Sequence, residues 1–359
     1  MKEMNGQAQI AIATLIIEVL VGFGIGYIVR TPSAPEGYRI AFSPNNLGSP
    51  YWRTCLAGAE KAVKDINDHF GKEVVSMSIA EYLDDPSKQA DHIDMIISGK
   101  YDLYVAPAVE EEPTVAPLKR LYEADIPCVL YDRDTAAAGR EYRLFCTITN
   151  NVDAGALEVE KLAEALEASG KPTPWKVACN WGHPGASSCE DRKTGSEAKL
   201  NELVAQGKVE IVGTNYHTAW SREAAMTDVE IWLVANPDLA AVVCSNDDMA
   251  LGSISAVEAA GLTPGEDVFI AGIDAIDEAV QAVKDGKLVV TLAQANYAMA
   301  YWGVLAGYAH VTMEWTSPAD VIPAPLTPVT KANADTFTLE DPKLDYWATY
   351  GPTVEELTD

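Results

Sequence analysis

The stretch "LAAVVCSNDDMALG", Leu239 to Gly252, decides the fold because it joins a buried strand to a helix through a short polar cluster. Its first six residues form an apolar run without alternation, which is typical of a parallel strand buried on both faces. Apolar residues then recur at helical spacing, and Asn246 or Asp247 suits the N-cap position. Asn246 therefore ends a parallel strand, where open α/β sheets bind ligands. Helix capping alone would also explain the polar cluster. The residues at the other strand ends must show whether a ligand site lies here.

The same order of strand and helix repeats along the chain from Tyr38. Apolar runs such as "YRIAFS", "EVVSMSIA", "DLYVAPA" and "WKVACNW" each precede a segment of helical periodicity. Repeated βα units predict a parallel sheet, and the pattern runs twice. We therefore expect an α/β protein with two similar, doubly wound parallel-sheet lobes. After Trp315, four prolines between residues 318 and 328 predict an extended segment.

Composition excludes several classes of protein. The chain has 359 residues, enough for two domains, and a net charge of -27, which argues against nucleic acid as a partner. The five His and six Cys show no metal-ligand or C-x-x-C spacing, so we expect neither a metal nor a cofactor. Buried free thiols are the default interpretation of the cysteines. A bridge between Cys179 and Cys189 is the alternative for a domain outside the cytoplasm.

The amino terminus carries the apolar segment "IAIATLIIEVLVGFGIGYIV", Ile10 to Val29, interrupted only by Glu18. Its length matches the ~20 residues that span a bilayer. We favour an uncleaved membrane anchor over a cleaved signal, because Pro35 makes "PSAP" a poor cleavage site. No lipobox cysteine follows the apolar run either, since the first cysteine is Cys55. Either interpretation predicts that the rest of the chain is extracytoplasmic.

Polar and aromatic side chains gather at the ends of the predicted strands. They are Asn46, Tyr51, Trp52, Asp132, Arg133, Arg192, Trp220, Asn246, Asp274 and Gln294. Each alone has a structural explanation as a cap, a turn residue or a surface ion pair. Together they offer fork-shaped donors and acceptors beside flat apolar faces. A neutral polyhydroxylated ring presents the complement, so the set predicts a sugar site.

Five motifs in this order, "LYDRD", "SSCEDRKTG", "NDDMALG", "IAGID" and "TLAQ", resemble those of the periplasmic sugar-binding proteins of ribose-type ABC transporters. The similarity covers about residues 38–330. It implies the type I periplasmic binding fold, in which two α/β lobes joined by three crossing segments close on one monosaccharide and deliver it to an ABC transporter permease. It implies no enzymatic activity. We expect a monomer, with the membrane contacted only through the N-terminal segment.

The resemblance also implies roles for the residues at the strand ends. Asp132 and Arg133 would contact the sugar from the first lobe. Arg192, Asn246 and Asp274 would do so from the second lobe, with Gln294 at a crossing segment. Tyr51, Trp52 and Trp220 would sandwich the ring. The predicted organisation is an anchor or signal with linker over residues 1–37, a first lobe over 38–150 and 295–325, and a second lobe over 151–294 and 326–359.

Departures from the family pattern leave the identity of the sugar open. The first loop, "NNLGSPYW", is longer than the ribose-type "NN-P-F-F", so Asn46 or Ser49 could occupy the Asn position. Ala275 stands where the family has Gly, and the tail from Ala334 to Asp359 has no assigned role.

Three other functions deserve comparison. A sugar-responsive transcription regulator would need an N-terminal helix-turn-helix and a basic surface. A hydrolase or dehydrogenase lacks its motifs: there is no G-x-S-x-G, and "GFGIG" lies inside the apolar segment. Asp132 and Asp274 could act as a glycosidase pair only at a separation of ~5 to 9.5 Å. A sensor that presents bound sugar to a chemoreceptor shares every feature of the first interpretation.

Overall fold

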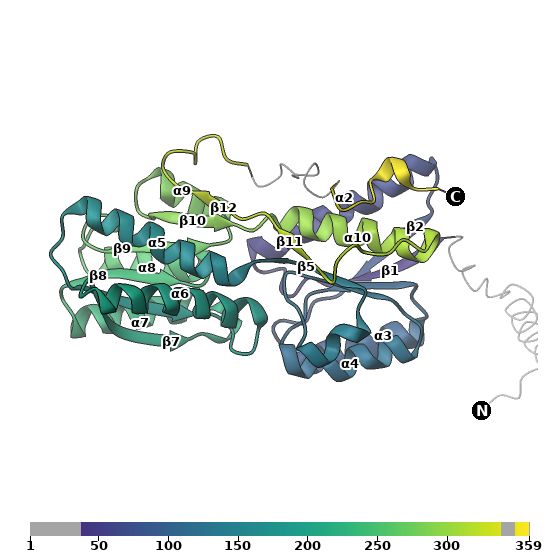
Figure 1. The fold of residues 1–359 in the computed structure, drawn as a ribbon, viewed down its shortest axis with the longest axis horizontal. Coiled ribbons are helices and arrows are strands. Elements are labelled where there is room, and N and C mark those ends of the chain that lie inside the picture. The colour runs from purple at the N-terminus through teal and green to yellow at the C-terminus, as the bar shows by residue number, and fades with distance from the viewer. Residues whose placement is uncertain (1–36, 339–348, 359) are drawn as a thin grey trace, which may run out of the picture. The chain divides into compact units, whose positions relative to one another are not determined.

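Two six-stranded sheets organise the protein, and a computed structural model describes residues 37–338 and 349–358 (Figure 1). The first sheet has the order β11-β5-β4-β3-β1-β2 and the second has the order β12-β10-β9-β8-β6-β7. All strand pairs between these elements are parallel except β10 with β12. The predicted fold of two parallel-sheet lobes is therefore confirmed. The strands of the first sheet are β1 (Tyr38–Phe42), β2 (Val75–Ile79), β3 (Leu103–Ala106), β4 (Cys128–Tyr131), β5 (Phe145–Thr149) and β11 (Val321–Ala324), and those of the second are β6 (Trp175–Trp181), β7 (Val209–Tyr216), β8 (Leu239–Cys244), β9 (Phe269–Ile273), β10 (Val290–Ala293) and β12 (Thr327–Val329).

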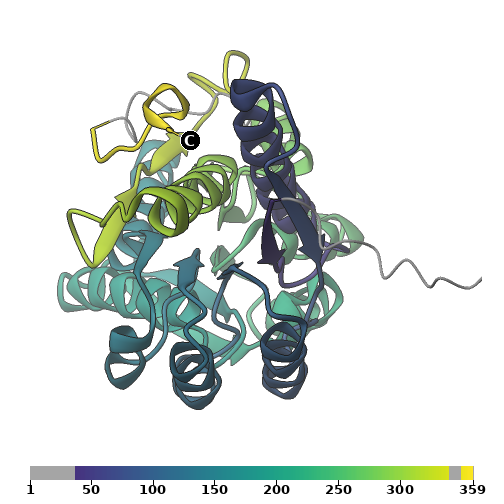
Figure 2. The ribbon, with the colours of Figure 1, turned by 90° about the vertical axis from the view of Figure 1, so that its right-hand side faces the viewer.

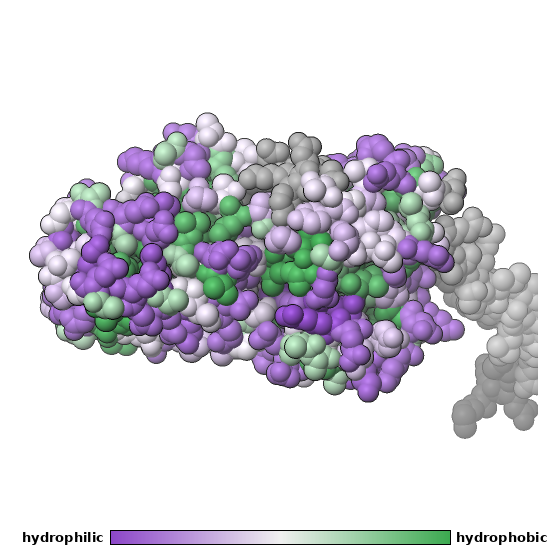
Figure 3. Space-filling view, viewed as in Figure 1, coloured by the Kyte–Doolittle hydropathy of each residue, from purple (hydrophilic) through white to green (hydrophobic). Residues whose placement is uncertain are grey.

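Helices cover both faces of each sheet, as the view onto the end of the first lobe shows (Figure 2). In the first lobe, α2 (Pro50–Phe70) and α10 (Asn296–Met313) pack on one face, and α3 (Pro86–Gly99) and α4 (Glu111–Glu123) on the other. In the second lobe, α5 (Asn151–Ser169) and α6 (Ser187–Ala205) pack on one face, and α7 (Arg222–Ala235), α8 (Asp247–Ala259) and α9 (Asp277–Lys284) on the other. Hydrophilic residues cover much of the surface seen in Figure 3.

The stretch that joins β8 to α8 folds as its sequence predicts. All six residues of β8 are buried. Asn246 then takes an extended conformation as N-cap, and its Oδ1 accepts a hydrogen bond of 3.0 Å from the Met249 N–H. This bond satisfies one of the free N–H groups at the start of the helix. Gly261, with φ +77, follows the end of α8.

Three crossing segments join the lobes, as the resemblance implied. They connect β5 to α5, β10 to α10 and β11 to β12. The proline-rich segment after Trp315 supplies β11, which pairs with β5, and β12, which pairs with β10. Its prolines suit the edge strand of each sheet, where one side of the backbone needs no ladder partner.

The structure bears on the predictions for the two chain ends and for the cysteines. The membrane segment Ile10–Val29 lies outside the described residues, and no helix among those described is long and apolar enough to cross a membrane. The exact lobe boundaries stay a prediction. Residues 354–357, which the prediction assigns to the second lobe, contact α2 in the first lobe, where His69 Nε2 lies 3.1 Å from the Leu357 carbonyl. All six cysteines are buried and free, so the alternative of a bridge between Cys179 and Cys189 was wrong.

Two glycines let α5 and α6 approach at backbone distance. A Cβ added at Gly155 would lie 2.0 Å from the carbonyl oxygen of Arg192, and one at Gly195 would lie 1.9 Å from that of Val152. Real Cβ atoms cannot come so close, so any side chain at these positions must push the helices apart. The packing of α5 on α6 therefore fixes the position of the Arg192 backbone.

We expect Gly155→Ala to lower the free energy of unfolding by about 1 to 3 kcal/mol, because the added methyl forces the two backbones apart. The measurement is urea unfolding followed by far-UV circular dichroism. Gly303→Ala is the matched control, since Gly303 also lies inside a buried helix but its added Cβ would meet only Val105 and Val129 at 3.6 Å. That variant should be neutral or gain up to about 1 kcal/mol. Equal stability of the two variants would contradict the close approach.

Candidate ligand-binding site

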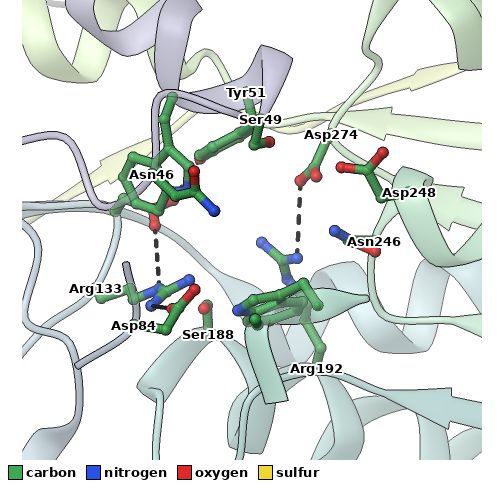
Figure 4. A pocket seen from close by; sticks show the side chains of 14 residues that line it. Asn46, Ser49, Tyr51, Asp84, Arg133, Ser188, Arg192, Asn246, Asp248 and Asp274 are labelled. Carbon is green, nitrogen blue, oxygen red and sulfur yellow. Dashed lines mark hydrogen bonds and ion pairs between the residues drawn. The ribbon is translucent and has the colours of Figure 1, made fainter. Parts of the chain in front are cut away.

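A pocket lies between the two lobes, with about 440 Å³ of empty volume that is partly open to solvent (Figure 4). Nine of the ten predicted residues line it, and they come from both lobes: Asn46, Tyr51, Trp52, Asp132, Arg133, Arg192, Trp220, Asn246 and Asp274. Ser49, the alternative to Asn46 in the first loop, also lines it, and four further lining residues were missed by sequence reasoning, namely Asp84, Ser188, Ala219 and Asp248. The carboxyl ends of β1, β4, β8 and β9 deliver most of this set, as expected for parallel sheets.

The first lobe contributes a guanidinium held between two carboxylates. Arg133 Nη1 lies 3.0 Å from Asp84 Oδ1, and its Nε lies 3.6 Å from Asp132 Oδ2. All three side chains are almost fully buried. The Tyr51 hydroxyl donates a hydrogen bond to Asp132. Burial raises the pKa of Asp132, and the positive charge of Arg133 opposes this rise.

In the second lobe, the buried Arg192 guanidinium uses each of its three nitrogens. Nε donates to Asn151 Oδ1 at 2.8 Å, Nη1 to the Ser245 carbonyl at 2.6 Å, and Nη2 to Gln294 Oε1 at 2.6 Å. Gln294 Nε2 in turn donates to Asp274 Oδ1 at 2.6 Å, and Asp274 lies 3.8 Å from Arg192. Burial raises the pKa of Asp274 well above its usual range. This network orients the second half of the pocket.

Gln294 differs from the other predicted site residues because it does not line the pocket. It is 1% exposed and bonds to two residues that do, Arg192 and Asp274. The structure therefore places it behind the site, where it fixes the positions of other groups.

Asn246 both caps a helix and lines the pocket, so the two interpretations of the polar cluster after β8 hold together. Its Oδ1 caps α8, while its Nδ2 points into the pocket (Figure 4). The two carboxylates after Asn246 both have partners within the protein, and Asp248 Oδ1 accepts a hydrogen bond of 2.9 Å from Arg222 Nη2. Asp247 accepts hydrogen bonds from the Ile276 N–H at 3.0 Å and from the Thr291 hydroxyl at 2.7 Å, which ties α8 to the neighbouring strand ends.

Two departures from the family pattern have local explanations. Asn46 and Ser49 both line the pocket, so the longer first loop presents both candidates for the Asn position. Ala275 has φ +54, a left-handed conformation that favours the family's Gly. A hydrogen bond of 2.8 Å from its N–H to Thr291 Oγ1 holds this backbone.

The aromatic residues face the pocket from opposite lobes. The Cζ atom of Arg133 lies 5.2 Å from the ring centroid of Trp52 and 5.3 Å from that of Trp220. Tyr51 and Trp52 meet edge to face, with centroids 5.2 Å apart. Flat apolar surfaces thus border the polar groups on two sides. Among the described residues no group of three or more His, Cys, Asp and Glu side chains could hold a metal ion.

Comparison with known proteins identifies the family. Residues 40–314 match the family described as periplasmic binding protein domain. The chain belongs to this family. It is 28% identical over 257 residues to the ribose import binding protein RbsB of Bacillus subtilis, a match that covers 72% of this chain and 76% of that protein. It is 25% identical over 244 residues to the D-apiose import binding protein of Actinobacillus succinogenes, covering 68% and 72% of the two chains.

Solved structures of the family share the fold. A solute-binding protein of an ABC transporter from Agrobacterium vitis, with bound alpha-D-tagatopyranose, superposes with a TM-score of 0.71 at 25% identity, covering 86% of this chain and 98% of that one. A periplasmic solute-binding protein from Actinobacillus succinogenes with bound D-allose gives a TM-score of 0.73 at 23% identity, covering 84% and 100%. The two-lobed fold of this family is therefore the fold of the chain.

A buried carboxyl supports the strand that leads to Asn246. Glu158 of α5 is fully buried, and its Oε1 accepts a hydrogen bond of 3.2 Å from the Cys244 N–H. Burial raises the pKa of Glu158 to about 8, although this hydrogen bond and the charge of Arg192 oppose the rise. The protonated, neutral form is therefore the one that the fold favours near neutral pH.

The raised pKa of Glu158 predicts that the folded state loses stability as the pH rises. Because the folded state keeps a proton that an unfolded Glu releases near pH ~4.3, the free energy of unfolding should fall as pH rises from there to about 8 and then level off. Glu158→Gln keeps the acceptor oxygen without the titration, so it should reduce this fall and be more stable than the native chain at pH 8. Urea unfolding from pH 5 to 8.5 measures both.

Glu164→Gln is the control, since Glu164 lies on the same helix and is 54% exposed. It should keep the native pH profile. An unchanged slope in Glu158→Gln would show that Glu158 is ionised in the folded protein.

Proposed function

We propose that the protein is the substrate-binding component of an ABC importer and that it captures one monosaccharide between its lobes. The observation that carries this proposal is the pocket where Asp132 and Arg133 of one lobe meet Arg192, Asn246 and Asp274 of the other. Membership of the periplasmic binding protein family supports it, as do relatives named for the import of ribose and D-apiose.

The chemistry of the pocket suits a neutral sugar. Carboxylates accept from hydroxyl groups, while the guanidinium and amide groups donate to their oxygens. Trp52 and Trp220 offer apolar faces to the CH groups of a ring. These hydrogen-bonding groups and apolar faces are sufficient to bind a sugar without catalysing a reaction.

Closure of the lobes provides the mechanism. Direct contacts already join the lobes beside the pocket: the Glu111 N–H donates to the Gly185 carbonyl at 3.0 Å, and the Asp134 N–H donates to Ser187 Oγ at 3.0 Å. A ligand that touches both lobes stabilises only this closed arrangement, so binding shifts the equilibrium between open and closed states. The three crossing segments are the hinge in this proposal, which retains the predicted lobe boundaries except that residues 354–357 belong with the first lobe.

The cellular setting follows from the same proposal. The receptor acts outside the cytoplasm as a monomer, the N-terminal segment tethers it to the membrane, and an ABC permease receives the sugar. Capture of a substrate for a permease requires this side of the membrane, and the hydrophobic segment Ile10–Val29 is long enough to serve as the tether.

The ligand can be identified by thermal unfolding. We expect one member of a panel of D-ribose, D-allose, D-galactose, D-fructose and myo-inositol to raise the melting temperature of the full-length chain in detergent, after a refolding step that removes carried ligand. At 100 times its dissociation constant a ligand adds about 2.7 kcal/mol of stability, which is readily measured. A response to one sugar but not to its epimers would support the proposal, and no response to any pentose, hexose or polyol would contradict it.

Replacement of Arg192, Asn246 or Asp274 with Ala should each cost about 1 to 3 kcal/mol of affinity, because every loss leaves a buried partner without its hydrogen bond. Isothermal titration with the sugar identified above measures the change. Lys193→Ala is the control, since Lys193 neighbours Arg192 in sequence but pairs with Glu197 at 3.3 Å on the surface of α6. Near-native affinity in all three site variants would remove this pocket as the binding site.

A further inference from the structure

Trp220 is presented to the pocket by a strained turn. It ends the short helix η2 (Thr218–Trp220), where Ala219 has φ +58 and Trp220 has φ +55. Left-handed backbone is unfavourable for bulky side chains and persists where the surrounding structure enforces it, often at functional sites. Here a hydrogen bond of 2.9 Å from the His217 N–H to the Trp181 carbonyl, and one of 3.2 Å from the Trp220 N–H to the His217 carbonyl, hold the turn.

Gly182 packs against one face of the indole. A Cβ at Gly182 would lie 2.1 Å from Cζ3 of Trp220, 2.3 Å from its Cε3 and 2.5 Å from its Cη2, which is a position over the six-membered ring that only glycine allows. This face of the ring is therefore covered by the protein. The opposite face and the ring edge that carries Nε1 remain for contacts in the pocket that Trp220 lines.

This N–H group has no acceptor in the described part of the chain. Nε1 of Trp220 is buried and makes no hydrogen bond there. Buried indole N–H groups usually find a partner, and an unmade bond is costly. The charged neighbours cannot supply an acceptor. Cζ of Arg133 and of Arg192 lie 5.3 Å and 5.6 Å from the ring centroid, but guanidinium groups only donate hydrogen bonds.

We propose that Trp220 binds the ligand through its Nε1–H as well as through its ring face, by donating a hydrogen bond to one hydroxyl oxygen of the sugar. The inference rests on the proposed function and makes it more specific. A ring face alone accepts any sugar with a suitable CH surface. A fixed donor requires an oxygen at one position, so Trp220 selects against sugars that lack it.

The test is a double-mutant cycle on the full-length chain. Isothermal titration compares the native chain with Trp220→Phe, which keeps a ring face but has no N–H, for the tightest-binding sugar of the panel above and for its monodeoxy analogues. We expect Trp220→Phe to weaken binding of the parent sugar by about tenfold. One deoxy analogue should bind the native chain more weakly than the parent does, but lose almost nothing further in the variant.

Trp52→Phe is the matched control from the other lobe. It makes the same chemical change and should weaken binding of the parent and of every deoxy analogue by one common factor. A common factor for Trp220→Phe as well, or native affinity in that variant, would overturn the inference and leave the proposed function standing. Failure of the native chain to bind any sugar would overturn both.

A second measurement covers the case in which Trp220→Phe does not fold. In the native chain labelled with ¹⁵N-tryptophan, the parent sugar should move one indole N–H resonance downfield, and one deoxy analogue should not. Trp220→Tyr assigns that resonance by its absence. Indole resonances that respond alike to the parent and to every deoxy analogue would contradict the proposed hydrogen bond.

Discussion

The buried Arg192 guanidinium is the constraint on which the site in the second lobe depends. A charge of this kind is costly to bury unless it is fully hydrogen-bonded. Its three nitrogens bond to Asn151, Ser245 and Gln294, which begin α5, follow β8 and follow β10. Two of these acceptors lie at crossing segments. One side chain therefore joins two crossing segments, the end of β8 and the pocket into a single network.

The helix that carries Arg192 is positioned just as strictly. Gly155 and Gly195 bring α5 and α6 to backbone contact, and α5 also supplies Glu158, which supports the end of β8. Packing and polar recognition thus share the same elements. In the first lobe the corresponding group is Arg133, but its partners are the carboxylates of Asp84 and Asp132. Each half of the pocket thus holds one Arg and two Asp, but Arg133 makes its closest contacts with carboxylates, whereas Arg192 makes them with neutral oxygens.

Much of this arrangement could be predicted from the sequence, and the exceptions have physical reasons. The apolar run Leu239–Cys244 and the cap at Asn246 predicted a strand, a helix and a position at the pocket, because the carboxyl ends of parallel strands meet at one edge of the sheet. Asp84 was missed because its role depends on Arg133, which lies far away in sequence. Gln294 was placed at the ligand because a strand end does not reveal which way a side chain points. The orientation of Trp220 depends on Gly182, and no local pattern records that contact.

The connectivity of the lobes has a mechanical consequence. The first lobe contains β1, which begins at Tyr38. Its helix α2 also contacts the chain near Leu357. Any force applied through the residues before Tyr38 therefore acts on the first lobe. The second lobe is connected to it through the crossing segments. For a receptor held at its amino terminus, closing would then be a swing of the second lobe toward a stationary first one.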